Sequence, residues 1–394
     1  MAKKFPEGFL WGAAYSSHQV EGDNDNNDWW RWEQKGKTKD KSGRACDSWN
    51  LYKVDHQLAQ ELGCGGFRLS LEWSRIEPEE GKFSDEAIEH YKKVLKDIHQ
   101  RGIKTVVTLW HWPLPLWFAD KCGWHKEESV EFFVKYCQKV THELGSEIDF
   151  FVTMNEPMVP LNSGYLIGKF PPGKKNPWLY KKAKKNMIEA HKKCYELTKK
   201  RYPRLPVGIT QLYNYFEPYN NFFLWRFLSK KLAHWYNYDI LDKINDHQDF
   251  VGLDYYFHYR IKISLQKPFY QKKENKKVSD LGWEIYPQGI YEIAKDAWER
   301  YQKPIYILEN GLADEKDKYR KEFIRDHLLW LHRAIEEGAD VRGYFHWSLI
   351  DNFEWAEGFE PRFGLCETDY KTMKRKPRDS YYDYRKIIKE NGLE

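Results

Sequence analysis

The sequence predicts an α/β protein that folds as a closed (β/α)8 TIM barrel, and three observations support this fold class. Eight short runs of β-prone residues recur along the 394-residue chain, and longer segments with helical spacing separate them. Most of these runs are apolar almost throughout, which is typical of parallel strands covered on both sides. No composition break or flexible linker divides the chain, so we expect residues 1–394 to form a single barrel domain.

The predicted strands follow one another at intervals that leave room for a helix after each. They are residues 9–14, 66–73, 104–110, 149–155, 207–213, 249–257, 304–310 and 342–348. In a barrel of this kind, reactive side chains gather at the C-terminal ends of the strands.

Segments between the strands have the spacing of amphipathic helices. Residues 85–102 carry apolar side chains at steps of three and four residues and end on a glycine. Residues 129–145 and 325–338 have the same form. Two stretches lack such a pattern and are predicted to be loops, namely residues 21–50 and the basic, polar stretch 265–280.

Composition limits the partners that we expect. Hydrophobic residues make up 41% of the chain, and no stretch approaches the roughly 18 apolar residues of a membrane helix. Lys and Arg total 64 against 59 for Asp and Glu, and the net charge of +5 is not gathered in a tail. We therefore expect neither a membrane nor a nucleic acid as a partner.

The N-terminal segment and the cysteines bear on the compartment. Pro6, Glu7 and Gly8 interrupt the apolar core that an export signal would need. The six cysteines show no CxxC or Cys/His spacing that would hold zinc, so we expect reduced thiols and no metal site. These features predict a cytoplasmic protein.

Aromatic residues are unusually frequent. They make up 17% of the chain, with 18 Trp and 27 Tyr. Aromatic faces pack against the apolar C–H faces of sugar rings, while the polar tips of Trp and Tyr form hydrogen bonds. The excess suggests a carbohydrate site, although large aromatics can equally fill a core.

Two carboxylates stand at corresponding strand ends. Glu156 follows the fourth predicted strand in "VTMNEP", and Glu309 lies near the end of the seventh in "ILENG", each beside an asparagine. Two carboxylates that face each other across a pocket can divide acid and nucleophile roles, and glycoside cleavage uses this arrangement. Either glutamate alone could be an ordinary solvated strand end, but the matched pair favours one site. Other strand ends contribute Arg68, His111, Trp112, Tyr255, Tyr256 and Trp347.

These motifs resemble those of glycoside hydrolase family 1, the retaining β-glucosidases and β-galactosidases. The resemblance runs from "FLWGAAYSSHQVEG" near the start to "RFGLCETDY" at 362–370, and so covers nearly the whole chain. It implies that Glu156 is the acid/base, that Glu309 is the nucleophile and that Asn155 binds the sugar 2-hydroxyl. A retaining enzyme should hold the two carboxyls about 5 to 5.5 Å apart, against roughly 6.5 to 9.5 Å for an inverting enzyme.

The resemblance also implies sugar contacts and groups that orient the nucleophile. Arg68 in "FRLSLEW" and Tyr256 in "GLDYY" would hydrogen-bond Glu309 and keep it ionised and aimed. Trp347 would stack beneath the sugar ring, and Trp283 would form a platform for the aglycone. The implied substrate-binding residues are Gln19, His111, Trp112, Trp283, Trp347, Glu354 and Trp355.

Three positions depart from the family's pattern. Leu308 stands where the family usually has Thr before the nucleophile, Pro113 replaces a usual Asp, and Asp254 replaces the usual Asn of "GLNYY". An additional ionised acid near Glu309 would disfavour the charge of the nucleophile, so the orientation of Asp254 matters. The chain is also shorter than typical members, chiefly after the fifth and sixth strands, which suggests a more open aglycone side.

The leading interpretation is a retaining exo-β-glycosidase, an O-glycosyl hydrolase like the β-glucosidases. It would remove terminal β-linked glucose, galactose or fucose from small glycosides or oligosaccharides. Water and two carboxylates suffice for this reaction, so we expect no cofactor. One alternative is a 6-phospho-β-glycosidase, although Glu357 in "EWAEGFEPRFG" would repel a phosphate. A non-hydrolytic carbohydrate-binding protein and a transglycosylase also remain open.

Overall fold

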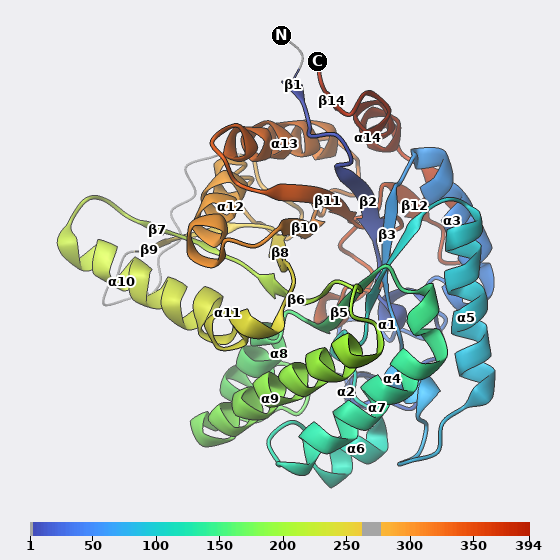
Figure 1. The fold of residues 1–394 in the computed structure, drawn as a ribbon. Helices are drawn as coiled ribbons and strands as arrows, with labels where there is room; N and C mark the ends of the chain where they lie inside the picture. Colours follow the sequence, from blue (N-terminus) through green and yellow to red (C-terminus); the bar gives the residue numbers. More distant parts are fainter. Residues whose placement is uncertain (1–2, 262–276) are drawn as a thin grey trace.

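Eight parallel strands close into a barrel, and this confirms the predicted fold class. The structure, a computed structural model, describes residues 3–261 and 277–394. Neighbouring barrel strands follow the order of the chain, and the last pairs with the first (Figure 1). The barrel strands are β2 (Leu10–Ala14), β3 (Gly66–Ser70), β4 (Lys104–Thr108), β5 (Phe150–Asn155), β6 (Val207–Leu212), β8 (Val251–Tyr255), β10 (Ile305–Asn310) and β11 (Val341–Trp347).

All eight predicted strands are present, and several end earlier than predicted. The run 66–73 becomes a strand over 66–70, and the run 249–257 becomes a strand over 251–255. Past the first end, Trp73 stacks on Tyr136 with ring centres 4.8 Å apart, and past the second end Tyr256 and Phe257 line a cavity.

Helices cover the outside of the barrel. The predicted helical segments 85–102, 129–145 and 325–338 correspond to α5, α7 and α13. The side chain of Ser84 caps α5 by accepting a hydrogen bond from the backbone N–H of Ala87 at 3.1 Å. The outer helices are α3 (Ser48–Leu62), α5 (Asp85–Gln100), α7 (Glu128–Leu144), α9 (Pro177–Arg201), α11 (Asp239–Ile244), α12 (Gln288–Tyr301), α13 (Arg320–Glu336) and α14 (Asp379–Glu390).

In the described part of the chain, three short strand pairs and six further α-helices lie outside the barrel sheet and its main outer helices. The strand pair β1 and β14 joins the two ends of the chain, while β12 pairs with β13 and β7 pairs with β9 outside the barrel. The short strands are β1 (Lys3–Lys4), β7 (Tyr215–Pro218), β9 (His258–Ile261), β12 (Cys366–Thr368), β13 (Arg375–Pro377) and β14 (Gly392–Leu393). The additional helices are α1 (Ser17–Val20), α2 (Asp28–Gln34), α4 (Trp73–Ile76), α6 (Leu116–Lys121), α8 (Met158–Pro160) and α10 (Phe223–Ala233).

The predicted loop 21–50 is wrong in part, because it contains α2 and the start of α3. Asn27 caps α2 by accepting a hydrogen bond from the N–H of Trp30 at 2.8 Å. Trp29 then packs against Trp355, with ring centres 4.7 Å apart. A cap and a buried tryptophan therefore stabilise a helix too short to show a periodic pattern. Of the other predicted loop, residues 265–276 lie outside the described residues.

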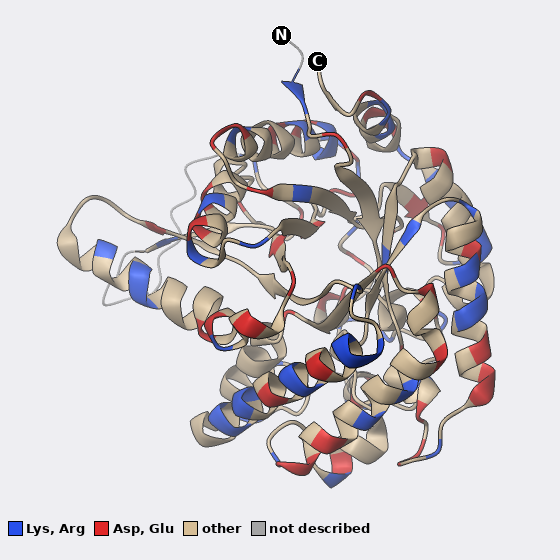
Figure 2. Ribbon diagram, in the orientation of Figure 1, with Lys and Arg blue, Asp and Glu red and all other residues tan. Residues whose placement is uncertain are grey.

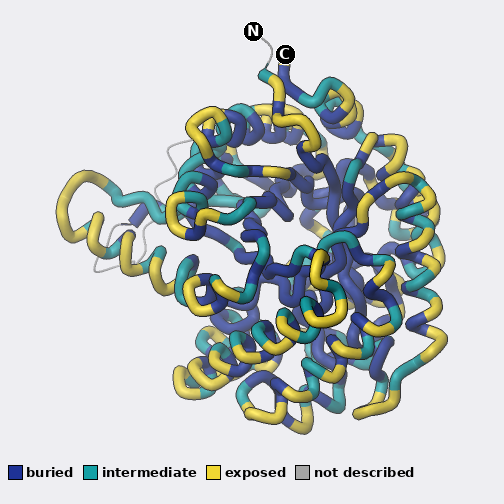
Figure 3. Tube along the Cα trace, viewed as in Figure 1, coloured by how far each residue is buried: buried dark blue, intermediate teal, exposed yellow. Residues whose placement is uncertain are grey.

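The barrel interior is closed by a cluster of apolar side chains. The strands are buried along almost their whole length, as the dark tube of Figure 3 shows. Within the described residues, no helix is long and apolar enough to cross a membrane. The interior cluster consists of Leu10, Val106, Val152, Phe250, Tyr306, Leu308 and Phe345.

Candidate active site

The strand ends bring the predicted site residues around one cavity of about 310 Å³. Both glutamates, Tyr256 and every substrate-binding residue implied by the resemblance line this cavity. The lining residues from the prediction are Gln19, His111, Trp112, Glu156, Tyr256, Trp283, Glu309, Trp347, Glu354 and Trp355. Arg68 and Asn155 are also fully buried nearby, but they lie behind the lining residues.

Both carboxylate oxygens of Glu309 are held. Arg68 Nη1 donates a hydrogen bond to Oε1 at 2.5 Å, and the hydroxyl of Tyr256 donates to Oε2 at 2.6 Å. The Arg68 and Glu309 side chains form an ion pair with exposed fractions of 1% and 4%. A cation and a hydroxyl that both favour the ionised carboxylate leave Glu309 aimed at the cavity as an anion.

A register irregularity in β10 directs Glu309 into the barrel. The pairing of β10 with β8 shifts between Ile307 and Glu309, so the strict alternation of side chains is broken there. Leu308 can consequently pack in the interior cluster while the next residue also faces inward. Gly311 follows closely, and a Cβ atom there would lie 1.8 Å from the carbonyl oxygen of Trp347. Leu308, which replaces the Thr usual in the family, therefore packs in the barrel interior beneath the site.

Glu156 has surroundings opposite to those of Glu309. Its side chain is buried, and its Oε1 has no hydrogen-bond partner among the described residues. Burial, followed by the charges of Glu309 and Asp254, raises the pKa of Glu156 well above its usual range. Carboxyl oxygens of Glu156 and Glu309 lie within 4.8 Å of each other. One carboxyl is therefore poised to hold a proton while its neighbour is ionised.

The backbone at Glu156 is strained. Its φ of +42° lies in the left-handed region that side chains other than glycine rarely adopt, and Trp112 (φ +85°) and Trp355 (φ +54°) share this feature. All three residues line the cavity. Strain of this kind concentrates at functional sites, where the surrounding fold holds a side chain in a required direction.

Asn155 links several site residues from behind the cavity. Its Oδ1 accepts hydrogen bonds from Arg68 Nη2 at 2.5 Å and from the hydroxyl of Thr210 at 2.7 Å. Its Nδ2 therefore faces His111 Nε2, at 3.1 Å, and the ring nitrogen must accept. Burial, together with the charge of Arg68, lowers the pKa of His111 well below its usual value, in keeping with a neutral ring. His111 takes one of the two N–H groups of Nδ2, which leaves the second able to donate to a ligand.

Gln19, Trp347 and Glu354 form a second polar group in the lining of the cavity. Gln19 Nε2 donates to the carbonyl oxygen of Phe353 at 2.8 Å and to Glu354 Oε2 at 3.4 Å. Trp347 Nε1 donates to Glu354 Oε1 at 3.4 Å. Burial raises the pKa of Glu354 to about 8, an effect that the Trp347 hydrogen bond partly offsets. Adjacent donors and acceptors of this kind suit the hydroxyls of a sugar.

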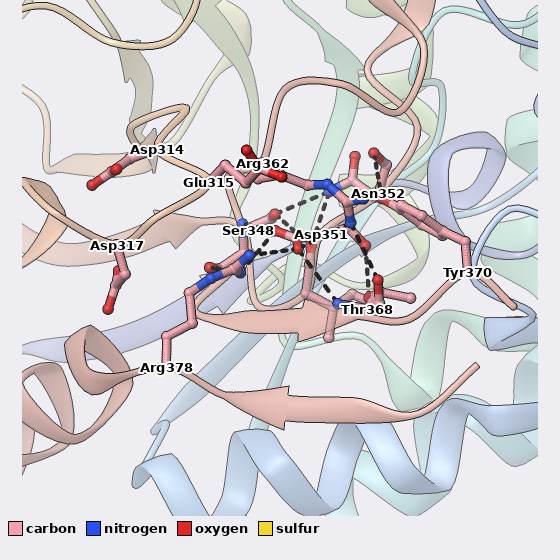
Figure 4. Close-up of polar contacts among 12 residues, drawn as sticks. Asp314, Glu315, Asp317, Ser348, Asp351, Asn352, Arg362, Thr368, Tyr370 and Arg378 are labelled. Carbon is pink, nitrogen blue, oxygen red and sulfur yellow. Dashed lines mark hydrogen bonds and ion pairs between the residues drawn. The ribbon is translucent and has the colours of Figure 1, made fainter. Parts of the chain in front are cut away.

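The loop that carries Glu354 and Trp355 is anchored by a buried aspartate (Figure 4). Asp351 is fully buried, and its two oxygens accept hydrogen bonds from Arg378 at 2.9 and 2.8 Å. Arg362 Nη1 also contacts Asp351 Oδ2 at 3.3 Å. The neighbouring Asn352 accepts a hydrogen bond from Gln19 at 2.9 Å. The Asp351 cluster therefore fixes one wall of the cavity.

Replacing Asp351 by Ala is expected to lower the free energy of unfolding by about 3–5 kcal/mol, because it leaves the buried Arg378 unpaired. Asp326 provides a matched control, since its ion pair with Arg325 is exposed and the Ala variant should cost at most about 1 kcal/mol. Urea unfolding of both variants measures the difference. Equal losses for the two variants would contradict the role assigned to Asp351.

Asp254 places a third carboxyl beside the pair. It is fully buried at the end of β8, and an oxygen of it lies within 4.8 Å of oxygens of Glu156 and Glu309. Burial, followed by the charge of Glu309, raises the pKa of Asp254 well above its usual range. These three carboxyls have a spacing that could suit a metal ion, but Arg68 already places a cation against Glu309. Asp254 is therefore a third acid beside the pair, and its charge, when it is ionised, raises the pKa of Glu156.

Replacing Asp254 by Asn is expected to move the alkaline limb of the kcat/KM profile to lower pH by roughly one unit. The charge of Asp254 contributes to the raised pKa of Glu156, so its removal lets Glu156 lose its proton at lower pH. The half-buried Asp296, which accepts a hydrogen bond from the hydroxyl of Tyr238 at 2.9 Å, gives a matched control in Asp296→Asn. An alkaline limb that does not move in Asp254→Asn, or moves equally in both variants, would contradict this reading.

Much of the apolar lining of the cavity was not predicted from the sequence. Among the described residues, seven further aromatic or aliphatic side chains line it, and none of them is among the predicted site residues. Phe257 packs against Trp283 with ring centres 4.8 Å apart, and Trp283 packs against Phe363 at 6.2 Å. Only the high aromatic content of the chain hinted at them. These additional lining residues are Val159, Phe170, Leu212, Phe257, Leu281, Ala356 and Phe363.

Two buried carboxyls that face each other at the C-terminal mouth of a TIM barrel, within an aromatic cavity, define an O-glycosyl hydrolase. The chain belongs to glycosyl hydrolase family 1, because the model of that family matches residues 1–237 and 229–393. The resemblance inferred from the motifs is thus confirmed.

Similar proteins agree with this assignment. Beta-glucosidase A of Thermotoga maritima is 33% identical, with 100% of this chain and 99% of that protein covered. A beta-galactosidase of Pyrococcus woesei is 31% identical, with 99% and 98% covered. The solved structure of a beta-glycosidase from Pyrococcus horikoshii is 40% identical with a TM-score of 0.94, covering 100% of this chain and 97% of that one. The T. maritima beta-glucosidase in complex with glucoimidazole is 32% identical, with a TM-score of 0.94 and 100% of both chains covered.

Proposed function

We propose that the protein is a retaining exo-β-glycosidase in which Glu309 is the nucleophile and Glu156 the acid/base. The observation that carries this proposal is that an oxygen of Glu156 lies within 4.8 Å of an oxygen of Glu309, combined with the opposite surroundings of the two carboxyls. A separation of roughly 6.5 to 9.5 Å would be needed to place a water between them for inversion. The relatives named beta-glucosidase and beta-galactosidase support a glycone of this class.

In the first half-reaction, Glu309 attacks the anomeric carbon while Glu156 gives its proton to the departing glycosidic oxygen. The bond from the anomeric carbon to the aglycone breaks, and an ester bond to Glu309 forms. Arg68 and Tyr256 already hold both oxygens of the nucleophile, so little reorganisation is required.

In the second half-reaction, Glu156 removes a proton from water, which attacks the anomeric carbon and releases Glu309 as a carboxylate. Once the ester has formed, the Glu309 charge that raises the pKa of Glu156 is gone, so Glu156 can act as a base. Two inversions at one carbon give overall retention.

The substrate is proposed to be a small β-glycoside or oligosaccharide. Gln19, Glu354 and Trp347 would contact the hydroxyls and face of the glycone, and Trp283 would receive the aglycone. Solved structures of T. maritima relatives hold deoxynojirimycin and isofagomine lactam, which supports the binding of sugar-sized molecules by this fold. Asn155 is proposed to donate its second Nδ2 N–H to the sugar 2-hydroxyl, while Arg68 and His111 hold its amide in place.

Proton NMR of the reaction mixture tests the stereochemistry. With a nitrophenyl β-glucoside as substrate, β-glucose should appear first and α-glucose only later, by mutarotation. If α-glucose were the first product, the double displacement would be excluded. A glucoside, galactoside and fucoside panel measured alongside ranks the three glycones.

A 6-phospho-β-glycosidase is the second candidate, and one observation weighs against it. Glu357 lines the cavity, and a carboxylate there would repel a phosphate. Lys39, which pairs with Glu357 at 2.8 Å, is also paired with Glu360 at 2.9 Å. A kcat/KM for a 6-phosphoglucoside above that for the glucoside would reverse this ranking.

We also propose that residues 1–394 form one catalytic domain in the cytoplasm. The packing of α14 against α3 and the pairing of β1 with β14 support a single unit. All six cysteines are buried and unpaired, which supports a reducing compartment.

A further inference from the structure

Exposed apolar side chains are concentrated on one part of the surface. Among the described residues, seven of the nine large apolar side chains that are exposed lie between positions 167 and 235. Phe223 is 73% exposed and Phe227 is 54% exposed. Figure 3 shows α10, which carries both, as an exposed helix that projects from the barrel. The apolar members on and beside α10 are Phe222, Phe223, Leu224, Phe227 and Trp235.

Positive charge is concentrated on the same segment. Residues 167–235 contain 16 Lys or Arg and only 3 Asp or Glu, whereas the whole chain has 64 against 59. Residues 167–235 are therefore strongly basic, although the net charge of the whole chain is small. On α10, Arg226, Lys230 and Lys231 add cations to the exposed rings (Figure 2), and none of the three has a carboxylate partner among the described residues. We call Arg226, Lys230 and Lys231, together with the five apolar residues named above, the α10 surface.

Rings and cations share one face of the helix. Phe223, Phe227 and Lys231 follow one another at steps of four residues, which places them side by side along α10. The Nζ atom of Lys231 lies 5.5 Å from the centre of the Phe227 ring. This face of α10 is thus both apolar and cationic. It differs from an ordinary solvated charged face that carries a single aromatic residue.

This chemistry matches the surface of an anionic lipid bilayer. Phenylalanine and tryptophan rings enter the boundary between headgroups and acyl chains, while lysine stems lie along it and their ammonium groups contact lipid phosphates. Double-stranded DNA would attract the cations but would leave the Phe side chains in water, because its bases are stacked within the duplex. Soluble proteins rarely leave a large contiguous apolar patch without a binding partner.

A row of aromatic rings runs from this surface toward the catalytic cavity. Trp235 contacts Tyr236, which contacts Phe216, with ring centres 6.0 and 6.2 Å apart. Phe216 stacks on Tyr259 at 5.6 Å. Tyr259 in turn contacts Phe257 at 5.2 Å, and Phe257 lines the cavity. The α10 surface therefore lies on the aglycone side of the site.

We propose that the α10 surface docks the protein reversibly on an anionic lipid bilayer, with the aglycone side of the cavity near the lipid. The proposal goes beyond the proposed glycosidase activity but takes the position of the active site from it. Because no described helix is long enough to span a bilayer, the contact is peripheral. The expectation of no membrane partner considered only spanning segments and total charge.

Vesicle co-sedimentation of the full chain tests the proposal. The protein should bind vesicles containing phosphatidylglycerol and be released by high salt, and it should bind pure phosphatidylcholine vesicles much more weakly. The double variants Phe223→Ser/Phe227→Ser and Lys230→Glu/Lys231→Glu should each lower the partition coefficient by at least about tenfold. Tyr382→Ser, which removes another exposed ring (55% exposed) from α14, is the matched control and should bind like the parent protein.

Hydrolysis of a nitrophenyl glycoside, measured on every variant, separates this proposal from the proposed function. The α10 variants should keep the parent activity, which shows that they are folded. If the active parent protein did not bind phosphatidylglycerol vesicles, the docking proposal would be overturned and the glycosidase assignment would stand. Binding lost equally in Tyr382→Ser would also overturn it. Preferential binding of double-stranded DNA over vesicles would do the same, as would self-association in place of vesicle binding that is lost in the Phe and Lys double variants.

Discussion

Glu309→Ala should lower kcat for a nitrophenyl β-glucoside by at least about 10⁴-fold, because the variant cannot form the glycosyl ester. The side chain is buried and held by Arg68 and Tyr256, and no other ionised carboxylate occupies its position. Steady-state kinetics measures the loss. Calorimetry with a sugar-like inhibitor should still show binding, because the glycone contacts with Gln19 and Glu354 remain.

Added azide distinguishes loss of the nucleophile from general damage. In Glu309→Ala, azide can enter the vacated space and attack the anomeric carbon once, while the nitrophenolate leaves, so the product should be the α-glycosyl azide. Glu367→Ala, at an exposed position of β12, is the matched control and should keep its activity within about twofold. Undiminished turnover in Glu309→Ala would reject its assignment as nucleophile.

Glu156→Gln should slow hydrolysis by a factor that depends on the leaving group. For an alkyl or sugar aglycone, which needs a proton to leave, the loss should be about 10²- to 10⁴-fold. For a dinitrophenyl glycoside, which leaves without a proton, formation of the ester should be much less affected. The alkaline limb of the pH profile should also disappear, because it reports the loss of the Glu156 proton, whose pKa is raised by burial and by Glu309.

Azide again provides the control, with the opposite stereochemistry. In Glu156→Ala the nucleophile is intact, so azide attacks the glycosyl ester and the product should be the β-glycosyl azide. The α-azide from this variant, or equal losses for good and poor leaving groups, would contradict the acid/base assignment.

Much of this architecture could be predicted from the sequence. The barrel strands are continuous apolar runs, and such runs can be recognised in the sequence without knowing which strands pair with them. Glu156 and Glu309 could be paired because both follow such runs, and parallel strands of one barrel end at the same mouth. The motifs around them then indicated the family.

Other features depend on contacts that no local pattern encodes. The register irregularity beside Leu308 arises from pairing with a neighbouring strand distant in sequence, so a departure from the family's motif could not be recognised as interior packing. The anchor formed by Asp351 and Arg378 joins residues 27 positions apart. The short helix α2 depends on the packing of Trp29 rather than on periodicity.

The basic segment 167–235 can be found in the sequence, but the sequence does not show that its cations lie beside exposed apolar side chains. Totals over the whole chain gave a near balance, and only the exposed placement of Phe223 and Phe227 beside Lys231 links the basic segment to an apolar surface. Side-chain exposure is decided by the packing of the whole molecule, which a single sequence does not show.

Trapping of the covalent intermediate tests the pairing of Glu309 with Glu156 most directly. A 2-deoxy-2-fluoro-β-glucosyl fluoride should react once per chain and add one fluoroglucosyl unit, which peptide mass spectrometry should locate on Glu309. Attachment to any other residue, or steady hydrolysis of substrates by a protein that never becomes labelled, would contradict the mechanism.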